Sequence, residues 1–200
     1  MEEFTICPVK FSGQPENAGQ RLTKEQMCYD LLDELEIQYD RVDHDAADTI
    51  AACHRVETVL GSEICKNLFL CNRQKTQYYL LLMQGDKVFK TKDLSKQLGC
   101  ARLSFADSED LMKCLNLTPG SVSVLGLQFD KEKQVQLVVD RPIQESRMIA
   151  CHPCINTSTV AFPAVDLFEK VLPALKHTPI FVDLPQQAQP DAPVSSGEAG

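Results

Sequence analysis

Apolar residues along this chain fall into short runs that are separated by polar turns. Residues 64–71 include six apolar side chains in eight positions, and residues 78–83 are apolar almost throughout. Runs this short are typical of buried strands, because a helix would extend over about ten residues or more. Residues 72–77 between them are polar, so the two runs predict a β-hairpin in the middle of a sheet.

A 3.6-residue period marks the first helix. Apolar residues recur on one face from Cys28 to Leu35, and Thr23 stands three residues before Gln26, which is the spacing of a capping box. This pattern predicts a helix over 23–36. Further helices are predicted at 49–53 with Asp48 or Thr49 as the cap, at 92–98 after Thr91, from 107 or 108 to 117, and around 164–176. Other strands are predicted at 37–42, 102–105, 122–129, 135–139, 158–162 and 180–184.

These elements follow one another without the regular βαβ rhythm of a parallel-sheet protein. The order predicts an α+β fold with a mixed, mostly antiparallel sheet and surrounding helices. Residues 1–20 contain prolines and glycines and show no sustained period, so we interpret them as an extended lead-in. We assign one domain to residues 21–185. Residues 186–200, rich in Gln, Ala, Pro, Ser and Gly, are predicted to be a disordered tail.

The composition is that of an ordinary globular domain, with 44% hydrophobic and 24% charged residues among 200. No apolar run approaches the roughly 18 residues that a membrane-spanning helix needs, and the first residues are acidic where a signal peptide would be basic. We therefore expect a cytoplasmic protein with no membrane contact. Nine scattered cysteines match no disulfide framework and are expected to be reduced packing residues.

The charge is unevenly distributed along the chain. A formal net charge of −8 argues against general nucleic-acid binding, and we expect no DNA partner. Residues 66–102, however, carry eight basic side chains against Asp86 and Asp93. This basic segment either forms a face that contacts phosphates or is a solvated helix with its turns. Its basic residues are Lys66, Arg73, Lys75, Lys87, Lys90, Lys92, Lys96 and Arg102.

Residues 151–154 read Cys-His-Pro-Cys and match the C-x-x-C pattern of redox pairs and zinc half-sites. A thioredoxin-like motif would open a helix, whereas this segment continues toward an extended run. A zinc site would need a second ligand pair at short spacing, and Cys65 and Cys71 are separated by five residues. Phosphate-binding fingerprints and the serine-hydrolase elbow are missing from the sequence. We therefore predict neither a metal nor a cofactor.

Three stretches carry candidate chemistry. Lys66 lies inside an apolar run, so its ammonium either reaches water along its stem or meets an anion in a cleft. Residues 118–123 contain a Pro-Gly turn, which is either an ordinary connection or a source of backbone N–H groups for a carboxylate or carbonyl. Residues 152–159 concentrate hydrogen-bonding side chains at the start of a predicted strand.

Taken in order, these stretches resemble the prolyl-tRNA editing domain family, the YbaK/ProX-type deacylases related to the editing insertion of bacterial prolyl-tRNA synthetases. The resemblance extends over about residues 23–184. It implies a mixed sheet curled into a partial barrel. The stretches that carry it are Asp48-Thr49-Ile50-Ala51, Lys66-Asn67-Leu68-Phe69-Leu70, Tyr78-Tyr79-Leu80-Leu81, Pro119-Gly120-Ser121-Val122-Ser123, and His152-Pro153 with Asn156, Thr157 and Thr159.

The resemblance also implies site residues. Lys66 matches the functional lysine of the family and His152 the histidine of its Gly-His-Pro motif, so both are expected to be catalytic. The expected substrate-binding residues are Thr49, Asn67, Gly120, Ser121, Asn156 and Thr157. Two positions depart from the family pattern: Val124 replaces a proline in the loop that closes on the aminoacyl group, and Cys151 replaces the glycine before the histidine.

The implied function is that of a trans-editing hydrolase that deacylates mischarged tRNA-Pro. His-Pro-x-x-Asn together with Lys-Asn resembles the alanine-specific branch, so Ala-tRNA-Pro is the expected substrate. The partner is the acceptor end of tRNA-Pro, with prolyl-tRNA synthetase as a second candidate. The alternative is a catalytically weak or inactive relative that binds tRNA or the synthetase, with the two departures as signs of drift.

Overall fold

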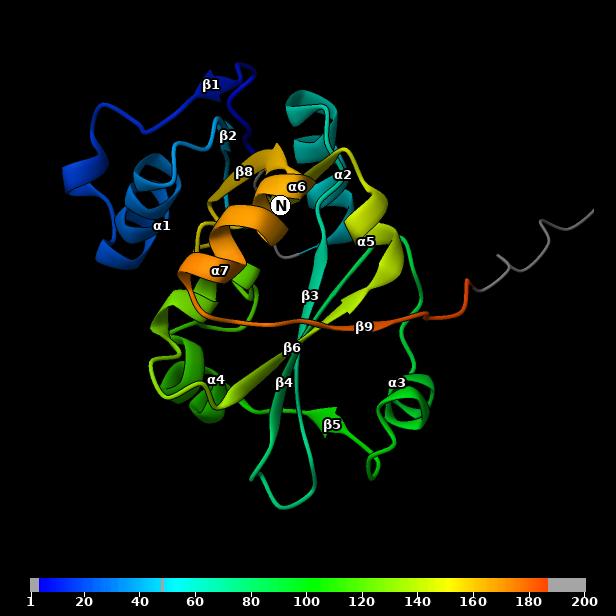
Figure 1. Cartoon of the computed structure of the whole chain (residues 1–200). Helices are drawn as coiled ribbons and strands as arrows, with labels where there is room; N and C mark the ends of the chain where they lie inside the picture. The colour runs from blue at the N-terminus through cyan, green and yellow to red at the C-terminus, as the bar shows by residue number, and fades with distance from the viewer. Residues whose placement is uncertain (1–3, 48, 187–200) are drawn as a thin grey trace, which may run out of the picture.

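The computed structural model describes residues 4–47 and 49–186, so most of the predicted tail lies outside the described residues. Strands cross the centre of the molecule and helices surround them (Figure 1). In chain order the elements are β1 (Phe11–Ser12), η1 (Ala18–Gln20), α1 (Thr23–Glu34), β2 (Asp40–Asp43), α2 (Ile50–Leu60), β3 (Lys66–Cys71), β4 (Tyr78–Met83), α3 (Thr91–Leu98), β5 (Ser104–Phe105), α4 (Ser108–Leu115), η2 (Val124–Phe129), β6 (Val135–Asp140), α5 (Arg141–Glu145), β7 (Met148–Cys151), β8 (Ser158–Pro163), α6 (Ala164–Asp166), η3 (Leu167–Val171), α7 (Leu172–Ala174) and β9 (Ile180–Val182).

The strands form two sheets. A four-stranded sheet has the order β1-β2-β8-β7, and a five-stranded sheet has the order β5-β3-β4-β6-β9. Only the β4–β6 and β6–β9 pairings are parallel. The predicted α+β class with a mixed, mostly antiparallel sheet is therefore confirmed. Both sheets are open, so the description as a partial barrel holds only loosely.

The two sheets meet at one parallel bridge between Ile64 and Ala150. The backbone N–H of Cys65 donates to the carbonyl oxygen of Ala150 over 2.8 Å. Lys66 and His152 each follow the bridge by two residues. Because paired parallel strands advance together, the bridge brings these two residues to the same edge of the molecule.

The predicted central hairpin is confirmed. β3 pairs with β4 in antiparallel register from Lys66 opposite Met83 to Cys71 opposite Tyr78. Leu80 and Leu82 face the larger hydrophobic core, while Leu81 and Met83 face a smaller core on the other side of the sheet. Both faces of the hairpin are thus covered, which explains why its strands are apolar without alternation.

Capping residues define α2 as expected, but the helix is longer than predicted. The Thr49 hydroxyl oxygen accepts a hydrogen bond from the backbone N–H of Ala52 over 3.1 Å. The helix then continues to Leu60 and ends at Gly61, which has a left-handed backbone with φ of 72°. The prediction ended the helix at 53, so the second half of α2 was missed.

Two other local predictions were wrong, and short elements were missed. Thr23 does not cap α1, because Leu22 holds the cap position and no side chain caps the helix. The carboxylate of Glu25, in the first turn, accepts hydrogen bonds from the Arg21 guanidinium and the Tyr29 hydroxyl. The run predicted as a strand at 122–129 instead contains the 3-10 helix η2, in which Val124, Leu125 and Leu127 are fully buried. The short elements α5 and β7 were not predicted, because neither is long enough to show a period.

No helix within the described ranges is long and apolar enough to span a membrane.

A buried ion pair ties three segments together. The Lys87 ammonium lies 2.6 Å from Oδ2 of Asp140, and the two side chains are only 4% and 0% exposed. The other carboxylate oxygen of Asp140 accepts from the backbone N–H of Leu184 over 2.9 Å. The chain after β4, the end of β6 and the chain after β9 are therefore fixed to one another. Lys87, which the sequence placed in the basic segment, is not part of the surface.

We expect Lys87→Met to lower the free energy of unfolding by about 3–5 kcal/mol, because it leaves a buried carboxylate without its counter-ion. Lys90→Met, at an exposed lysine of the same segment, should change it by less than about 0.5 kcal/mol. Urea denaturation of the two variants measures the difference. Equal stabilities of the two variants would show that the pair contributes nothing.

Candidate functional site

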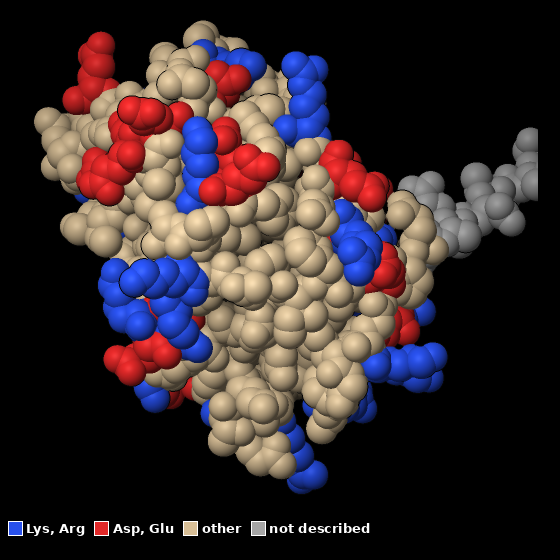
Figure 2. Space-filling view, in the orientation of Figure 1, with Lys and Arg blue, Asp and Glu red and all other residues tan. Residues whose placement is uncertain are grey.

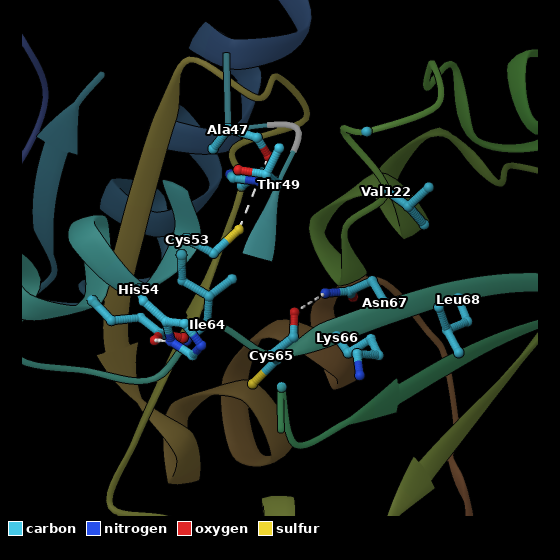
Figure 3. Close-up of a pocket in the computed structure, with 14 residues that line it drawn as sticks. Ala47, Thr49, Cys53, His54, Ile64, Cys65, Lys66, Asn67, Leu68 and Val122 are labelled. Carbon is cyan, nitrogen blue, oxygen red and sulfur yellow. Dashed lines mark hydrogen bonds and ion pairs between the residues drawn. The ribbon is translucent and has the colours of Figure 1, made fainter. Parts of the chain in front are cut away.

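A cavity of about 410 Å³ opens beside the bridge between the two sheets. We call it the α2–β3 cavity. Figure 3 shows Thr49 and Cys53 on its α2 side, Val122 on the opposite side and Asn67 on β3 between them. Its lining residues are Ala47, Thr49, Cys53, His54, Glu57, Ile64, Cys65, Lys66, Asn67, Leu68, Gly85, Gly120, Val122 and His152.

Lys66 is partly exposed at the start of β3. Its ammonium donates to the backbone carbonyl of Lys87 over 2.8 Å, which engages one of its three N–H groups. Gly85 approaches the same strand so closely that a Cβ there would lie 2.6 Å from the carbonyl oxygen of Ile64. The loop after β4 therefore packs against this wall of the cavity and holds the lysine in place.

Asn67 presents an unsatisfied acceptor. Its side-chain N–H group donates to the backbone carbonyl of Cys65 over 3.0 Å. Its Oδ1 atom is buried and receives no hydrogen bond from any residue that the structure describes. A buried amide oxygen without a donor costs about 1–3 kcal/mol. Its place in a cavity wall makes it suited to accept a hydrogen bond from a ligand.

The turn before η2 supplies another wall. The backbone N–H of Ser121 donates to the carbonyl of Thr118 over 3.0 Å, and Gly120 has φ of 84°. A proline followed by a residue with positive φ is the pattern of a type II turn, which explains why glycine stands at 120. Ser121 does not line the cavity. Its buried hydroxyl donates to the Thr118 carbonyl over 2.9 Å and stabilises the turn.

His152 is 7% exposed and lies at the base of the cavity wall that follows β7. Its Nδ1 atom lies 3.0 Å from the Ser158 carbonyl oxygen and 3.2 Å from the Thr159 hydroxyl oxygen. The same hydroxyl lies 2.9 Å from Nε2 of His44, a residue that sequence reasoning did not assign to the site. Burial lowers the pKa of His44, although the nearby Asp43 and Asp45 oppose the shift.

Asn156 and Thr157 do not line the cavity either. Their backbone carbonyls accept hydrogen bonds from the backbone N–H groups of Ala47 and His44, each over 3.0 Å. The two residues therefore hold the segment before α2 against the segment after His152. Of the eight predicted site residues, the structure gathers five around the cavity, namely Thr49, Lys66, Asn67, Gly120 and His152.

His54 and Glu57 were missed by sequence reasoning. They lie in the second half of α2, where Nδ1 of His54 is 2.7 Å from one carboxylate oxygen of Glu57. The other oxygen accepts from the backbone N–H of Ile64 over 2.8 Å. The i, i+3 spacing of the two residues was the available signal. It was overlooked because the helix was predicted to end at 53.

The two positions that depart from the family pattern lie in the core. Val124 is 0% exposed and Cys151 is 1% exposed, and neither lines the cavity. Burial raises the pKa of the Cys151 thiol, and the sulfur of Cys154 lies 3.3 Å from that of Cys28. Neither departure from the family pattern therefore changes the cavity wall directly.

We find no candidate metal site in the part of the chain that the structure describes. No cluster of three or more His, Cys, Asp or Glu side chains there is arranged to hold a metal ion. The expectation that the site works without a metal or cofactor stays a prediction.

The basic segment contributes fewer free cations than its sequence indicates. Lys75 pairs with Asp107 and Asp110, and Lys87 is buried. Lys and Arg side chains project around α3 at the lower right of Figure 2. Most of the acidic side chains visible in this view lie over the upper part of the molecule. Five basic residues are exposed and form no ion pair with any described residue: Arg73, Lys90, Lys92, Lys96 and Arg102.

Comparison with solved structures supports the fold. A crystal structure described as a candidate trans-editing enzyme for prolyl-tRNA synthetase superimposes with a TM-score of 0.61 at 12% identity, covering 82% of this chain and 99% of that one. The crystal structure of the hypothetical protein APE2540 gives a TM-score of 0.57 at 16% identity, covering 75% of this chain and 94% of that one.

Sequence comparison identifies closer relatives. The chain is 35% identical over 147 residues to the prolyl-tRNA editing protein ProX of Acetoanaerobium sticklandii, which covers 74% of this chain and 89% of that protein. It is 30% identical over 156 residues to the prolyl-tRNA synthetase associated domain-containing protein 1 of Mus musculus, covering 76% and 91%. The family model of the aminoacyl-tRNA editing domain matches residues 44–169. This chain therefore belongs to the aminoacyl-tRNA editing domain family, in its YbaK/ProX-type group.

Proposed function

We propose that this protein is a trans-editing deacylase that hydrolyses the ester of mischarged tRNA-Pro, with alanine as the preferred amino acid. The observation that carries the proposal is the α2–β3 cavity, in which a member of this family gathers Lys66, Asn67, Gly120 and His152. The ProX relative is named as a prolyl-tRNA editing protein, which supports the substrate class.

The size and polarity of the cavity suit an aminoacyl ester. A volume of about 410 Å³ lies within the usual range for small-ligand sites, roughly 300–1,000 Å³. The unsatisfied Oδ1 atom of Asn67 accepts from the amino group or a ribose hydroxyl of the substrate. The Lys66 ammonium stabilises the negative charge that develops on the ester oxygen, or binds the adjacent phosphate.

Hydrolysis then needs little covalent chemistry from the protein. Water adds to the ester carbon, and the bond to the ribose oxygen breaks. One proton of the water restores the ribose hydroxyl, and the other passes to solvent as the amino acid leaves as its carboxylate. The walls of the cavity hold the ester and the water in position. Bringing two reactants together accounts for a large part of the activation free energy of such a reaction, so this positioning lowers the barrier. His152 and the Gly120 turn, which also line the cavity, contribute further hydrogen-bonding groups.

The free cations around α3 provide the surface for the tRNA. Lys90, Lys92, Lys96 and Arg102 are exposed and unpaired among the described residues, so they can neutralise acceptor-stem phosphates. Phe105, in the edge strand β5, is 60% exposed and packs edge-on against Phe89, which adds an aromatic surface for an unpaired base.

The alternative of an inactive relative rested on Val124 and Cys151. Both residues are buried in the core, and neither lines the cavity. Their positions therefore give that alternative no support, and deacylation stays the better proposal.

Release of labelled alanine from Ala-tRNA-Pro tests the function directly, and Lys66→Met tests its central residue. We expect kcat/KM to fall by at least about 100-fold, because one charged group that stabilises the transition state is lost. The thermal midpoint should stay unchanged, since the Lys66 ammonium bonds only one carbonyl. Lys90→Met is the control for the loss of a cation. Unchanged turnover in Lys66→Met would assign the lysine a structural role.

We expect the selectivity for the amino acid to depend on the part of the cavity wall that Val122 forms. We expect hydrolysis of Ala-tRNA-Pro to exceed that of Pro-tRNA-Pro by about 100-fold or more, because overlap of the proline ring with a rigid wall is penalised more steeply than a missing contact. Val122→Ala should raise the relative rate on Pro-tRNA-Pro. Val124→Ala removes the same atoms from the core, so it should lower stability and leave the ratio unchanged. A native preference for Pro-tRNA-Pro would contradict the size argument.

Charge reversal on α3 tests the tRNA surface. In Lys92→Glu/Lys96→Glu we expect a higher KM for Ala-tRNA-Pro, with a salt dependence reduced by about one unit of slope for each lost phosphate contact. Lys131→Glu, an exposed lysine in the turn before β6, changes the net charge without touching this surface. If Lys131→Glu raised KM as much as a single α3 substitution, net charge rather than a local surface would govern binding.

A further inference from the structure

A carboxylate forms part of the wall of the α2–β3 cavity, and it belongs to Glu57. Among the lining residues that the structure describes, no other is an Asp or a Glu. The Glu57 side chain is 17% exposed. The backbone N–H of Ile64 donates to one carboxylate oxygen over 2.8 Å, and Nδ1 of His54 lies 2.7 Å from the other. Contacts at both oxygens therefore fix the orientation of the carboxylate.

The carboxylate of Glu57 has no permanent cation beside it in the described part of the chain. No Lys or Arg there forms an ion pair with it, and Lys66, which lines the same cavity, donates to the carbonyl of Lys87 instead. His54 is charged only when protonated, and its side chain is 65% exposed, so water screens the attraction. A carboxylate oxygen has two acceptor positions, so each oxygen of Glu57 can receive one more donor.

Other carboxylates make this end of the cavity negative. Burial and the charges of Asp86 and Glu57 raise the pKa of Glu63, although His54 opposes the shift. Glu63 and Asp86 do not line the cavity. A cation that enters is thus attracted by three carboxylates, and of these it can contact Glu57 in the cavity wall.

Unlike charges therefore lie at two places along one wall. Glu57 is anchored at Ile64, and Lys66 follows Ile64 by two residues of nearly extended chain, which is roughly 7 Å. Figure 3 shows His54 and Ile64 on one side and Lys66 at the start of β3. An aminoacyl ester is charged in the same way, since its α-ammonium lies on one side of the ester carbonyl and the ribose with its phosphate on the other.

From this arrangement we infer that Glu57 binds the α-ammonium group of the aminoacyl ester and restricts the substrates to esters with a free amine. The inference rests on the proposed deacylation for the identity of the ligand. With the ammonium at Glu57, Oδ1 of Asn67 is left to accept from the ribose hydroxyl. N-acetylated and peptidyl esters lack the charge and add bulk against the α2 side of the cavity, so both are rejected.

The contacts of Glu57 allow its charge to be removed without its hydrogen bond to the backbone. In Glu57→Gln the amide oxygen can still accept from the Ile64 N–H, so the contact between α2 and the segment before β3 is kept. Glu63→Gln is the matched control, because it removes the same charge from an exposed residue outside the cavity wall. Thermal midpoints close to that of the native chain show that both variants are folded.

Binding of two non-hydrolysable analogues tests the inference without turnover. Both are amides of 3′-amino-3′-deoxyadenosine 5′-phosphate, one with alanine and one with lactic acid, so they differ by an ammonium group against a hydroxyl. By titration calorimetry we expect the native chain and Glu63→Gln to bind the alanyl analogue at least about 10-fold more tightly, because a hydrogen bond between charged groups is the stronger one. In Glu57→Gln the ratio of affinities should fall to about one.

The native chain alone can overturn the inference in this experiment. Equal affinities for the two analogues, or no binding of the alanyl analogue, would show that the cavity does not recognise the amine. An unchanged ratio in folded Glu57→Gln would show that another group recognises it.

Kinetics on Ala-tRNA-Pro and lactyl-tRNA-Pro provide the second measurement. We expect Glu57→Gln to lower kcat/KM for Ala-tRNA-Pro by at least about 10-fold, chiefly through KM, and to leave the value for lactyl-tRNA-Pro nearly unchanged. The native chain should hydrolyse N-acetyl-Ala-tRNA-Pro at least about 100-fold less efficiently than Ala-tRNA-Pro. Equal losses on the alanyl and lactyl esters in Glu57→Gln would assign Glu57 to the structure of the wall and overturn the inference, as would efficient hydrolysis of the acetylated ester.

The two measurements separate this inference from the proposed function. If the native chain prefers the alanyl analogue through Glu57 but releases no alanine from Ala-tRNA-Pro, recognition of the amine stands and the proposed deacylation fails. If the chain deacylates Ala-tRNA-Pro while Glu57→Gln leaves the preference for the ammonium unchanged, the recognition fails and the proposed function stands.

Discussion

The junction between the two sheets is the constraint on which the candidate site depends. One parallel bridge, with a hydrogen bond from the Cys65 N–H to the Ala150 carbonyl, joins the start of β3 to β7. Each strand contributes a cavity residue two positions later, Lys66 from one and His152 from the other. A fold with the same two sheets but no contact at this point would place these residues on separate surfaces. The candidate site is therefore a consequence of how the sheets meet, not of either sheet alone.

A second constraint acts from the far side of β3. The Lys87–Asp140 ion pair is buried, and its lysine also supplies the carbonyl that receives the Lys66 ammonium. Desolvating two charges is costly, and a hydrophobic pair of similar size is often as stable. What the ion pair adds here is position: it fixes the loop after β4 against β6 and so determines where the Lys66 side chain ends. The lysine in the cavity is thus oriented by a lysine outside it.

Local patterns predicted much of the fold, because some features are determined by residues that are close in sequence. The Thr49 cap and the hairpin of β3 and β4 depend on neighbours in sequence, and both were confirmed. The segment at 122–129 was predicted wrongly as a strand, because a nearly continuous apolar run lacks the period that separates a strand from a helix. Lys66, Asn67, Gly120 and His152 were found through resemblance to a family. His44 and Glu57 were not, since their places depend on the β2–β8 register and on the true length of α2.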